Sequence, residues 1–120
     1  MGESEGKERP HYYVLNAAGE PEPASVLEWG KWLEEASTDR TRVIAQDKDE
    51  SQDGEIMVST VFIGLDYNFL GEGPPILWET MILGGPLHGY QERYSSRGAA
   101  LAGHQEACDL MRKAAKRIKK

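Results

Sequence analysis

Residues 57–96, MVSTVFIGLDYNFLGEGPPILWETMILGGPLHGYQERYSS, decide the fold class of this chain. They hold most of its large apolar residues, in three runs separated by two turns that contain glycine and proline. Apolar or alternating runs bounded by such residues are typical of strands in a meander. Strands are therefore predicted at 56–65, 76–83 and 90–94. Both faces of the first two are apolar, which indicates central strands of a sheet.

The preceding half of the chain is predicted to add two more strands. Residues 11–16 (HYYVLN) and 42–46 (RVIAQ) are rich in aromatic or β-branched side chains. Residues 17–23 are predicted to turn, because two prolines there cannot donate to a regular ladder. The stretch 47–55 contains five acidic residues, a glycine and no large apolar residue, which indicates a solvated hairpin loop.

Two helices complete the predicted fold. The first begins at Ser25, which forms a capping box with Glu28, and Gly30 in its interior is expected to allow a close approach by another element. The second begins at Ser95 or Ser96. The inward residues are predicted to be Val26, Trp29, Leu33 and Ala36, with Trp32 flanking them, in the first helix, and Leu101, His104, Cys108, Met111, Ala115 and Ile118 in the second.

These elements predict a single α+β domain of two layers, in the order β-α-β-β-β-β-α, with an antiparallel sheet and both helices on one side. The 120 residues fit one domain, which we place at 11–118. Residues 1–10 are expected to be a disordered leader and 119–120 a flexible basic end.

Composition and charge exclude several classes of protein. The chain has no apolar run long enough to span a bilayer and no secretory signal at its start, so we expect a cytoplasmic protein without membrane partners. Its one cysteine leaves no internal disulfide. The net charge of −6 argues against broad nucleic-acid binding. The basic terminal segment could contact nucleic acid, but we favour the interpretation that its cations complement the dipole of the last helix.

Four segments carry a resemblance to known sequences: VLEWGKWLE, VSTVFIGLDYNF, GPPILWETMILGG and AGHQEA. Through their order and spacing, residues 11–110 resemble a family of small uncharacterised proteins encoded by phages, prophages and bacterial genomes. The resemblance implies a small accessory protein of phage or prophage type. It implies no activity, cofactor or catalytic residue.

Glu79 is the first candidate site residue, because it interrupts an apolar strand face where an unpaired carboxylate would be costly. Arg93 is the only base in residues 57–96 and could pair with Glu79 across neighbouring strands. The alternative is a pocket in which Glu79, Arg93, Tyr94 and His104 perform acid–base chemistry or capture an anion.

His104 and Cys108 lie one helical turn apart and could bind a metal, but two ligands do not make a zinc site. We expect a buried histidine, hydrogen-bonded to a strand carbonyl, beside a cysteine that acts as a small apolar filler, and no metal site or cofactor. The stretch 66–72 begins like a calcium loop, yet leucines occupy later ligand positions.

The loop at 67–75 carries Tyr67, Phe69 and Leu70 among glycines and prolines, and it is the best candidate for a binding surface. The alternative is that Phe69 folds back onto the core.

Three functions stay open. The chain could be a non-catalytic protein-binding module or inhibitor, which we favour. It could be an acidic decoy that mimics nucleic acid, with a continuous acidic face. It could be a small enzyme with a cavity around Glu79, Arg93 and His104. The partner is predicted to be a protein, and self-association stays open.

Overall fold

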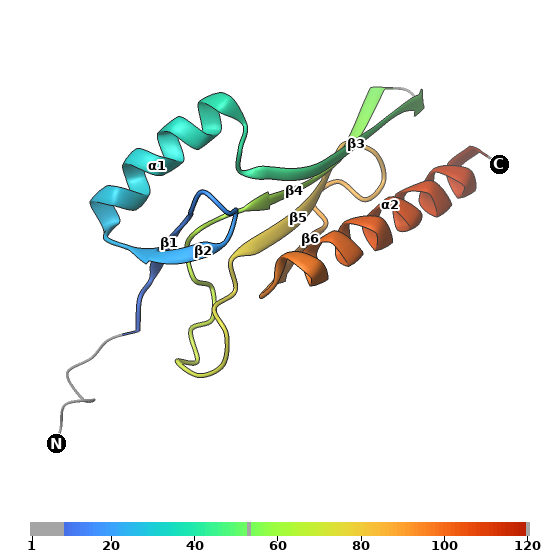
Figure 1. Cartoon of the computed structure of the whole chain (residues 1–120). Coiled ribbons are helices and arrows are strands. Elements are labelled where there is room, and N and C mark those ends of the chain that lie inside the picture. Colours follow the sequence, from blue (N-terminus) through green and yellow to red (C-terminus); the bar gives the residue numbers. More distant parts are fainter. Residues whose placement is uncertain (1–8, 53, 120) are drawn as a thin grey trace, which may run out of the picture.

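A four-stranded antiparallel meander lies at the centre of the protein (Figure 1). The computed structural model describes residues 9–52 and 54–119. The strands follow one another in space as β3-β4-β5-β6, so β4 and β5 are central, as predicted. Their bounds are Val43–Gln52 for β3, Gly54–Phe62 for β4, Trp78–Leu83 for β5 and Gln91–Tyr94 for β6.

The second helix, α2 (Arg97–Lys119), lies along one face of this sheet (Figure 1). It begins where predicted, since the Ser96 hydroxyl accepts a hydrogen bond from the Ala99 amide at 3.1 Å. Alternate residues of the central strands are buried beneath it, as the two-residue period of a strand requires. This part of the core consists of Ile56, Val58, Ile82, Ala107, Cys108 and Met111.

The first helix, α1 (Val26–Asp39), packs with a two-stranded sheet at the other end of the same face. The capping box of Ser25 and Glu28 is present. The Trp32 ring lies 5.6 Å from that of Phe62, which in turn lies 5.4 Å from Trp78. Because Trp78 also belongs to a cluster with Ala100 of α2, both helices contribute to one side of the meander, as predicted.

One strand was not predicted. β1 (Tyr12–Leu15) pairs antiparallel with β2 (Pro21–Ala24), so the element order is β-β-α-β-β-β-β-α. The prediction that prolines forbid pairing at 17–23 was wrong. Successive residues of an edge strand point their amides in opposite directions, and the prolines occupy alternate positions, where no amide has to reach β1. The α+β class of the fold is confirmed.

The predicted acidic loop at 47–55 was also wrong. β3 continues through it to Gln52 and pairs with β4, with irregularities in register near Val43 and beyond Asp49. Pairing with the apolar β4 therefore outweighs the low strand propensity of aspartate and lysine. One side chain at the start of this stretch, Asp47, reaches α2, as described below.

The buried stripe of α2 includes His104, Cys108 and Met111, as predicted, but not Leu101. Leu101 is 39% exposed, and the buried residues are Ala100, Gly103, His104, Ala107, Cys108 and Met111. The side chains of Ala115 and Ile118 lie outside the described part of the structure. In α1, Val26 is 52% exposed. No atom comes within 4 Å of a Cβ built at Gly30, so the close approach expected there was wrong. Small residues set the helix–sheet contact at α2 instead.

The ends of the chain were assigned to flexible segments. Residues 1–8 and 120 lie outside the described residues, but Arg9 contacts Asp66 and α2 includes position 119. Among the residues described, neither helix is long and apolar enough to cross a membrane.

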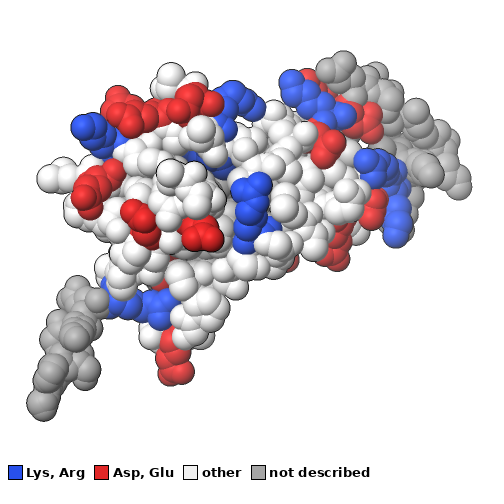
Figure 2. Space-filling model, viewed as in Figure 1, with Lys and Arg blue, Asp and Glu red and all other residues white. Residues whose placement is uncertain are grey.

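Charged side chains are distributed over both ends of the visible face (Figure 2). Acidic groups gather over α1 and others lie toward the opposite end of the molecule, and basic groups lie beside both sets and between them. On this face, the described residues therefore do not form the continuous acidic surface that a nucleic-acid decoy requires.

Candidate functional site

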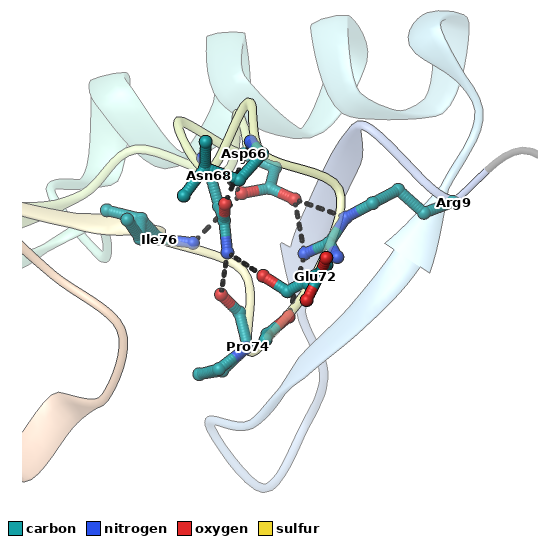
Figure 3. Close-up of polar contacts among 8 residues, drawn as sticks. Arg9, Asp66, Asn68, Glu72, Pro74 and Ile76 are labelled. Atoms are coloured by element: carbon teal, nitrogen blue, oxygen red, sulfur yellow. Dashed lines mark hydrogen bonds and ion pairs between the residues drawn. The ribbon is translucent and has the colours of Figure 1, made fainter.

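The loop between β4 and β5 (residues 63–77, the β4–β5 loop) is held by one buried carboxylate (Figure 3). Asp66 is 3% exposed. Its Oδ1 accepts hydrogen bonds from the amides of Asn68 at 2.7 Å and Ile76 at 3.0 Å. Its Oδ2 accepts from Arg9 Nε at 3.2 Å and Nη2 at 3.0 Å. Each oxygen therefore accepts two hydrogen bonds from the protein, and neither is free to bind calcium.

Asn68 braces the tip of the same loop. Its Nδ2 donates to the carbonyls of Glu72 at 2.7 Å and Pro74 at 2.9 Å (Figure 3). Its Oδ1 accepts from the Leu70 amide at 3.1 Å. Arg9 Nη2 closes the loop from outside by donating to the Gly73 carbonyl at 3.1 Å. Hydrogen bonds to and from the side chains of Asp66, Asn68 and Arg9 thus fix the backbone of the loop.

The hydrogen bonds to Asp66 also fix its charge. Burial alone would raise the pKa of this carboxyl, but donation from the Ile76 and Asn68 amides and from Arg9 outweighs burial and lowers the pKa. Asp66 is therefore ionised at neutral pH and forms a charged pair with Arg9. The sequence did not indicate this role, because Arg9 lies 57 residues away in the predicted leader.

Two apolar side chains stand out from the loop. Phe69 is 82% exposed and Leu70 is 88% exposed. The alternative in which Phe69 folds back onto the core does not match this geometry. Tyr67 is half-buried, and its ring centroid lies 5.9 Å from that of Phe69. The Arg93 guanidinium lies over the Tyr67 ring, 4.0 Å from its centroid. The structure thus brings together the three loop residues named from the sequence and attaches them to β6.

The cross-strand pair of Glu79 and Arg93 is present. These residues are direct partners in the β5–β6 register, and Arg93 Nε donates to Glu79 Oε2 at 3.1 Å. Gln91 Nε2 donates to the same oxygen at 2.5 Å. The carboxylate that interrupts the apolar strand is therefore paired on its own face of the sheet.

The four residues of the alternative pocket do not meet. Tyr94 pairs in register with the buried Trp78 and faces α2, the helix that carries His104. Glu79 and Arg93 lie one residue along their strands and point to the opposite face. Burial, with the nearby Tyr90 and Glu92, raises the pKa of Tyr94 to about 12, so its hydroxyl stays protonated at neutral pH.

His104 is buried as predicted, but its ring nitrogens contact side chains of β4 and β3 and not a strand carbonyl. Its Nδ1 lies 2.7 Å from Thr60 Oγ1, which lies 2.5 Å from Thr80 Oγ1. Its Nε2 lies 2.8 Å from Asp47 Oδ2. The hydrogen bond with His104 is the main cause that lowers the pKa of Asp47, so the carboxylate is the acceptor. Sequence reasoning missed Asp47 and Thr60, because the first was assigned to a solvated loop and the second to ordinary strand packing.

Cys108 is closed to solvent and protonated. It is 1% exposed, its Sγ lies 3.6 Å from Asp47 Oδ2, and burial together with Asp47 raises the pKa of the thiol to about 11. The Thr60 hydroxyl is 0% exposed. This hydroxyl and the Cys108 thiol are both poor nucleophiles, although His104 and Asp47 lie beside them.

We expect Cys108 to react with a disulfide reagent at pH 8 at least about 100-fold more slowly than an accessible thiol, because both access and thiolate content are low. The control is a Cys108→Ala/Ser37→Cys variant, whose single thiol stands at an exposed position of α1. Thiol release followed by absorbance, with a chelator present, measures both rates. Equal rates in the two folded proteins would contradict the burial of Cys108.

A cavity of about 390 Å³ opens between the β1–β2 turn, α1 and the start of α2. Neither Glu79 nor His104 lines it. Its lining is formed by Leu15, Asn16, Ala17, Gly19, Trp32, Thr41 and Arg97. Arg97 is the one ionisable group in that set, so the cavity offers no acid–base pair.

Comparison of the chain with protein-family models, with curated proteins and with solved structures gives no match. The exposed apolar tip of the β4–β5 loop therefore stands as the candidate functional site on its geometry alone.

Proposed function

We propose that the protein is a small non-catalytic accessory protein of phage or prophage type, which acts in the cytoplasm by binding another protein through the tip of the β4–β5 loop. The observation that carries the proposal is the exposure of Phe69 and Leu70, at 82% and 88%, on a loop whose backbone is already fixed by Asp66 and Asn68.

The energetics of binding support this role. Large apolar side chains are the usual anchors of protein interfaces, and burying each of them fully is worth about 1.5–3 kcal/mol. A loop that is ordered before binding loses little conformational entropy when the partner arrives. Phe69 and Leu70 therefore meet both requirements of an interface anchor.

The surroundings of the anchors indicate the kind of partner. The Phe69 ring contacts the Tyr67 ring, and the Arg93 guanidinium lies over the Tyr67 ring. The carboxylate of Glu79 pairs with Arg93 and neutralises its charge. Two copies of a chain with net charge −6 repel each other. The geometry and charge thus favour a different protein, with an apolar pocket for Phe69 and Leu70 and a neutral or basic rim.

We expect a Phe69→Ala/Leu70→Ala variant to bind the partner about 30-fold or more weakly, since the loss of one strong anchor alone costs about 2 kcal/mol. Its thermal midpoint should stay within about 2 °C of the wild type, because both side chains are exposed and contribute little to the core. The partner is first retained from host-cell extract on immobilised wild-type protein, then purified and titrated against each variant by calorimetry.

The matched control is Leu27→Ala, which removes a leucine that is 83% exposed on α1. It should bind the partner as tightly as the wild type. Undiminished binding by the Phe69→Ala/Leu70→Ala variant would refute the proposal. So would a wild-type dimer, detected by sedimentation, that the double substitution converts to a monomer, because the loop would then serve self-association.

A further inference from the structure

Three different metal-binding groups converge where β3 meets α2. Asp47 of β3 and His104 and Cys108 of α2 each offer one donor atom, and these oxygen, nitrogen and sulfur atoms all lie within 4.8 Å of one another. His104 and Cys108 are four residues apart, so they project from the same side of the helix. The sequence analysis named His104 and Cys108 as possible ligands. Asp47 joins them because β3 extends further than predicted.

We propose that Asp47, His104 and Cys108 form a binding site for a divalent transition metal ion, with Zn²⁺ as the best match. A thiolate and an imidazole are ligands that zinc favours, whereas calcium and magnesium require oxygen donors. Three protein ligands with different donor atoms leave one position of a tetrahedral ion for water.

The distances require a modest adjustment, and the third pair of donor atoms, His104 Nε2 and Cys108 Sγ, lies within 4.8 Å. Asp47 Oδ2 lies 2.8 Å from His104 Nε2 and 3.6 Å from Cys108 Sγ. Ligands at roughly 2.0–2.3 Å from a tetrahedral zinc are roughly 3.3–3.8 Å apart, so the carboxylate has to retreat from the imidazole by less than about 1 Å. The Asp47 side chain is 55% exposed, which leaves it free to make this movement.

The histidine is already oriented as a zinc ligand. In metalloproteins the ring nitrogen that does not bind the ion usually donates to a neighbouring oxygen, which fixes the tautomer and the orientation of the ring. Here Nε2 faces the other two donors and Nδ1 lies 2.7 Å from the buried Thr60 hydroxyl. Thr80 in turn contacts Thr60 at 2.5 Å, so the supporting oxygen is itself held.

The burial of the ligands defines the character of the site. His104 and Cys108 are 4% and 1% exposed, and Asp47 forms the side that faces solvent. The water position of the ion therefore lies toward Asp47. An ion there would link the long β3 strand to α2, and the folded state would gain stability from metal binding.

Zn²⁺ and Co²⁺ are suitable probes. We expect Zn²⁺ to bind with one-to-one stoichiometry in calorimetry, and Co²⁺ to give a thiolate charge-transfer band and the visible absorption of a tetrahedral ion. Asp47→Asn should weaken Zn²⁺ binding at least about 10-fold, while its amide oxygen can still accept from His104. Cys108→Ala should abolish the thiolate band. Asp109→Asn, which removes a comparably exposed carboxylate next to Cys108, should leave the affinity and both spectra unchanged.

Thermal unfolding with and without Zn²⁺ gives a second measurement of metal binding. Zn²⁺ should raise the midpoint of the wild type and of Asp109→Asn, and should raise that of Asp47→Asn by clearly less. The proposal is overturned if Co²⁺ binds without a thiolate band, as it would at the exposed His11 or His88. It is also overturned if Zn²⁺ stabilises the Asp47→Asn variant as much as the wild type, or if neither metal binds.

Discussion

An Asp66→Ala variant is expected to unfold with a free energy about 3 kcal/mol lower than the wild type at pH 7. The substitution removes the acceptor of four hydrogen bonds and leaves the amides of Asn68 and Ile76 without their partner inside the loop. Hydrogen bonds to a charged group contribute about 1.5–3 kcal/mol, and breaking a buried pair by removing one member costs more than removing an exposed one. Urea denaturation followed by tryptophan fluorescence measures the difference.

The loss should depend on pH in a defined direction. The folded state lowers the pKa of Asp66, so its contribution is present in full above the unfolded value of about 3.9. It disappears as the pH falls through the lower folded pKa. An Asp66→Asn variant should therefore be less stable than the wild type at pH 7, and the gap should narrow below about pH 4.

Glu72→Ala serves as the matched control, because its exposed side chain is removed from the same loop while its carbonyl still accepts from Asn68. It should change stability by less than about 0.5 kcal/mol. The partner affinity of Asp66→Ala should also fall, since Phe69 and Leu70 then have to be ordered on binding. A stable Asp66→Ala protein with full affinity would show that the loop does not depend on this carboxylate.

The sequence predicted the features that depend on local periodicity or on nearby residues. Alternating burial in β4 and β5 follows from a two-residue period, and the pair of Glu79 and Arg93 could be found because one base alone was within reach. The capping box at Ser25 is likewise a local pattern. The fold class followed from these features.

The sequence failed where distant residues decide the outcome. The acidic stretch after Gln46 looks like a loop, and it becomes a strand because β4 offers it hydrogen-bonding partners. For that reason Asp47 could not be assigned to a site with His104 and Cys108. Asp66 resembled the start of a calcium loop, and only the return of Arg9 shows that it anchors the chain. In each case the missing information was a contact between segments far apart in the sequence.

The effect of substituting a glycine also depends on contacts between residues far apart in the sequence. Gly103 gives the second large expected effect on stability. Gly103 of α2 is buried against β6, and a Cβ added to it would overlap the ring of Tyr94. Gly103→Ala therefore has to displace Tyr94 or lift α2 from the sheet. Overpacking of this kind costs about 1–3 kcal/mol, which outweighs the gain of up to about 1 kcal/mol that alanine normally brings to a helix interior.

Gly30→Ala is the matched control, because a Cβ at this position in α1 meets no atom within 4 Å. It should stabilise the protein by about 0.5–1 kcal/mol. The two glycines thus predict opposite signs for the same substitution, which thermal or urea unfolding resolves directly.

A double-mutant cycle identifies the cause of the loss at Gly103. Tyr94→Ala removes the ring that an added Cβ would meet, so in that background Gly103→Ala should no longer destabilise and should approach the gain seen at Gly30. The expected coupling energy is therefore at least about 1 kcal/mol. If Gly103→Ala raises stability in the wild-type background, α2 has room to spare above β6, and the small residues of its buried stripe do not set its distance from the sheet.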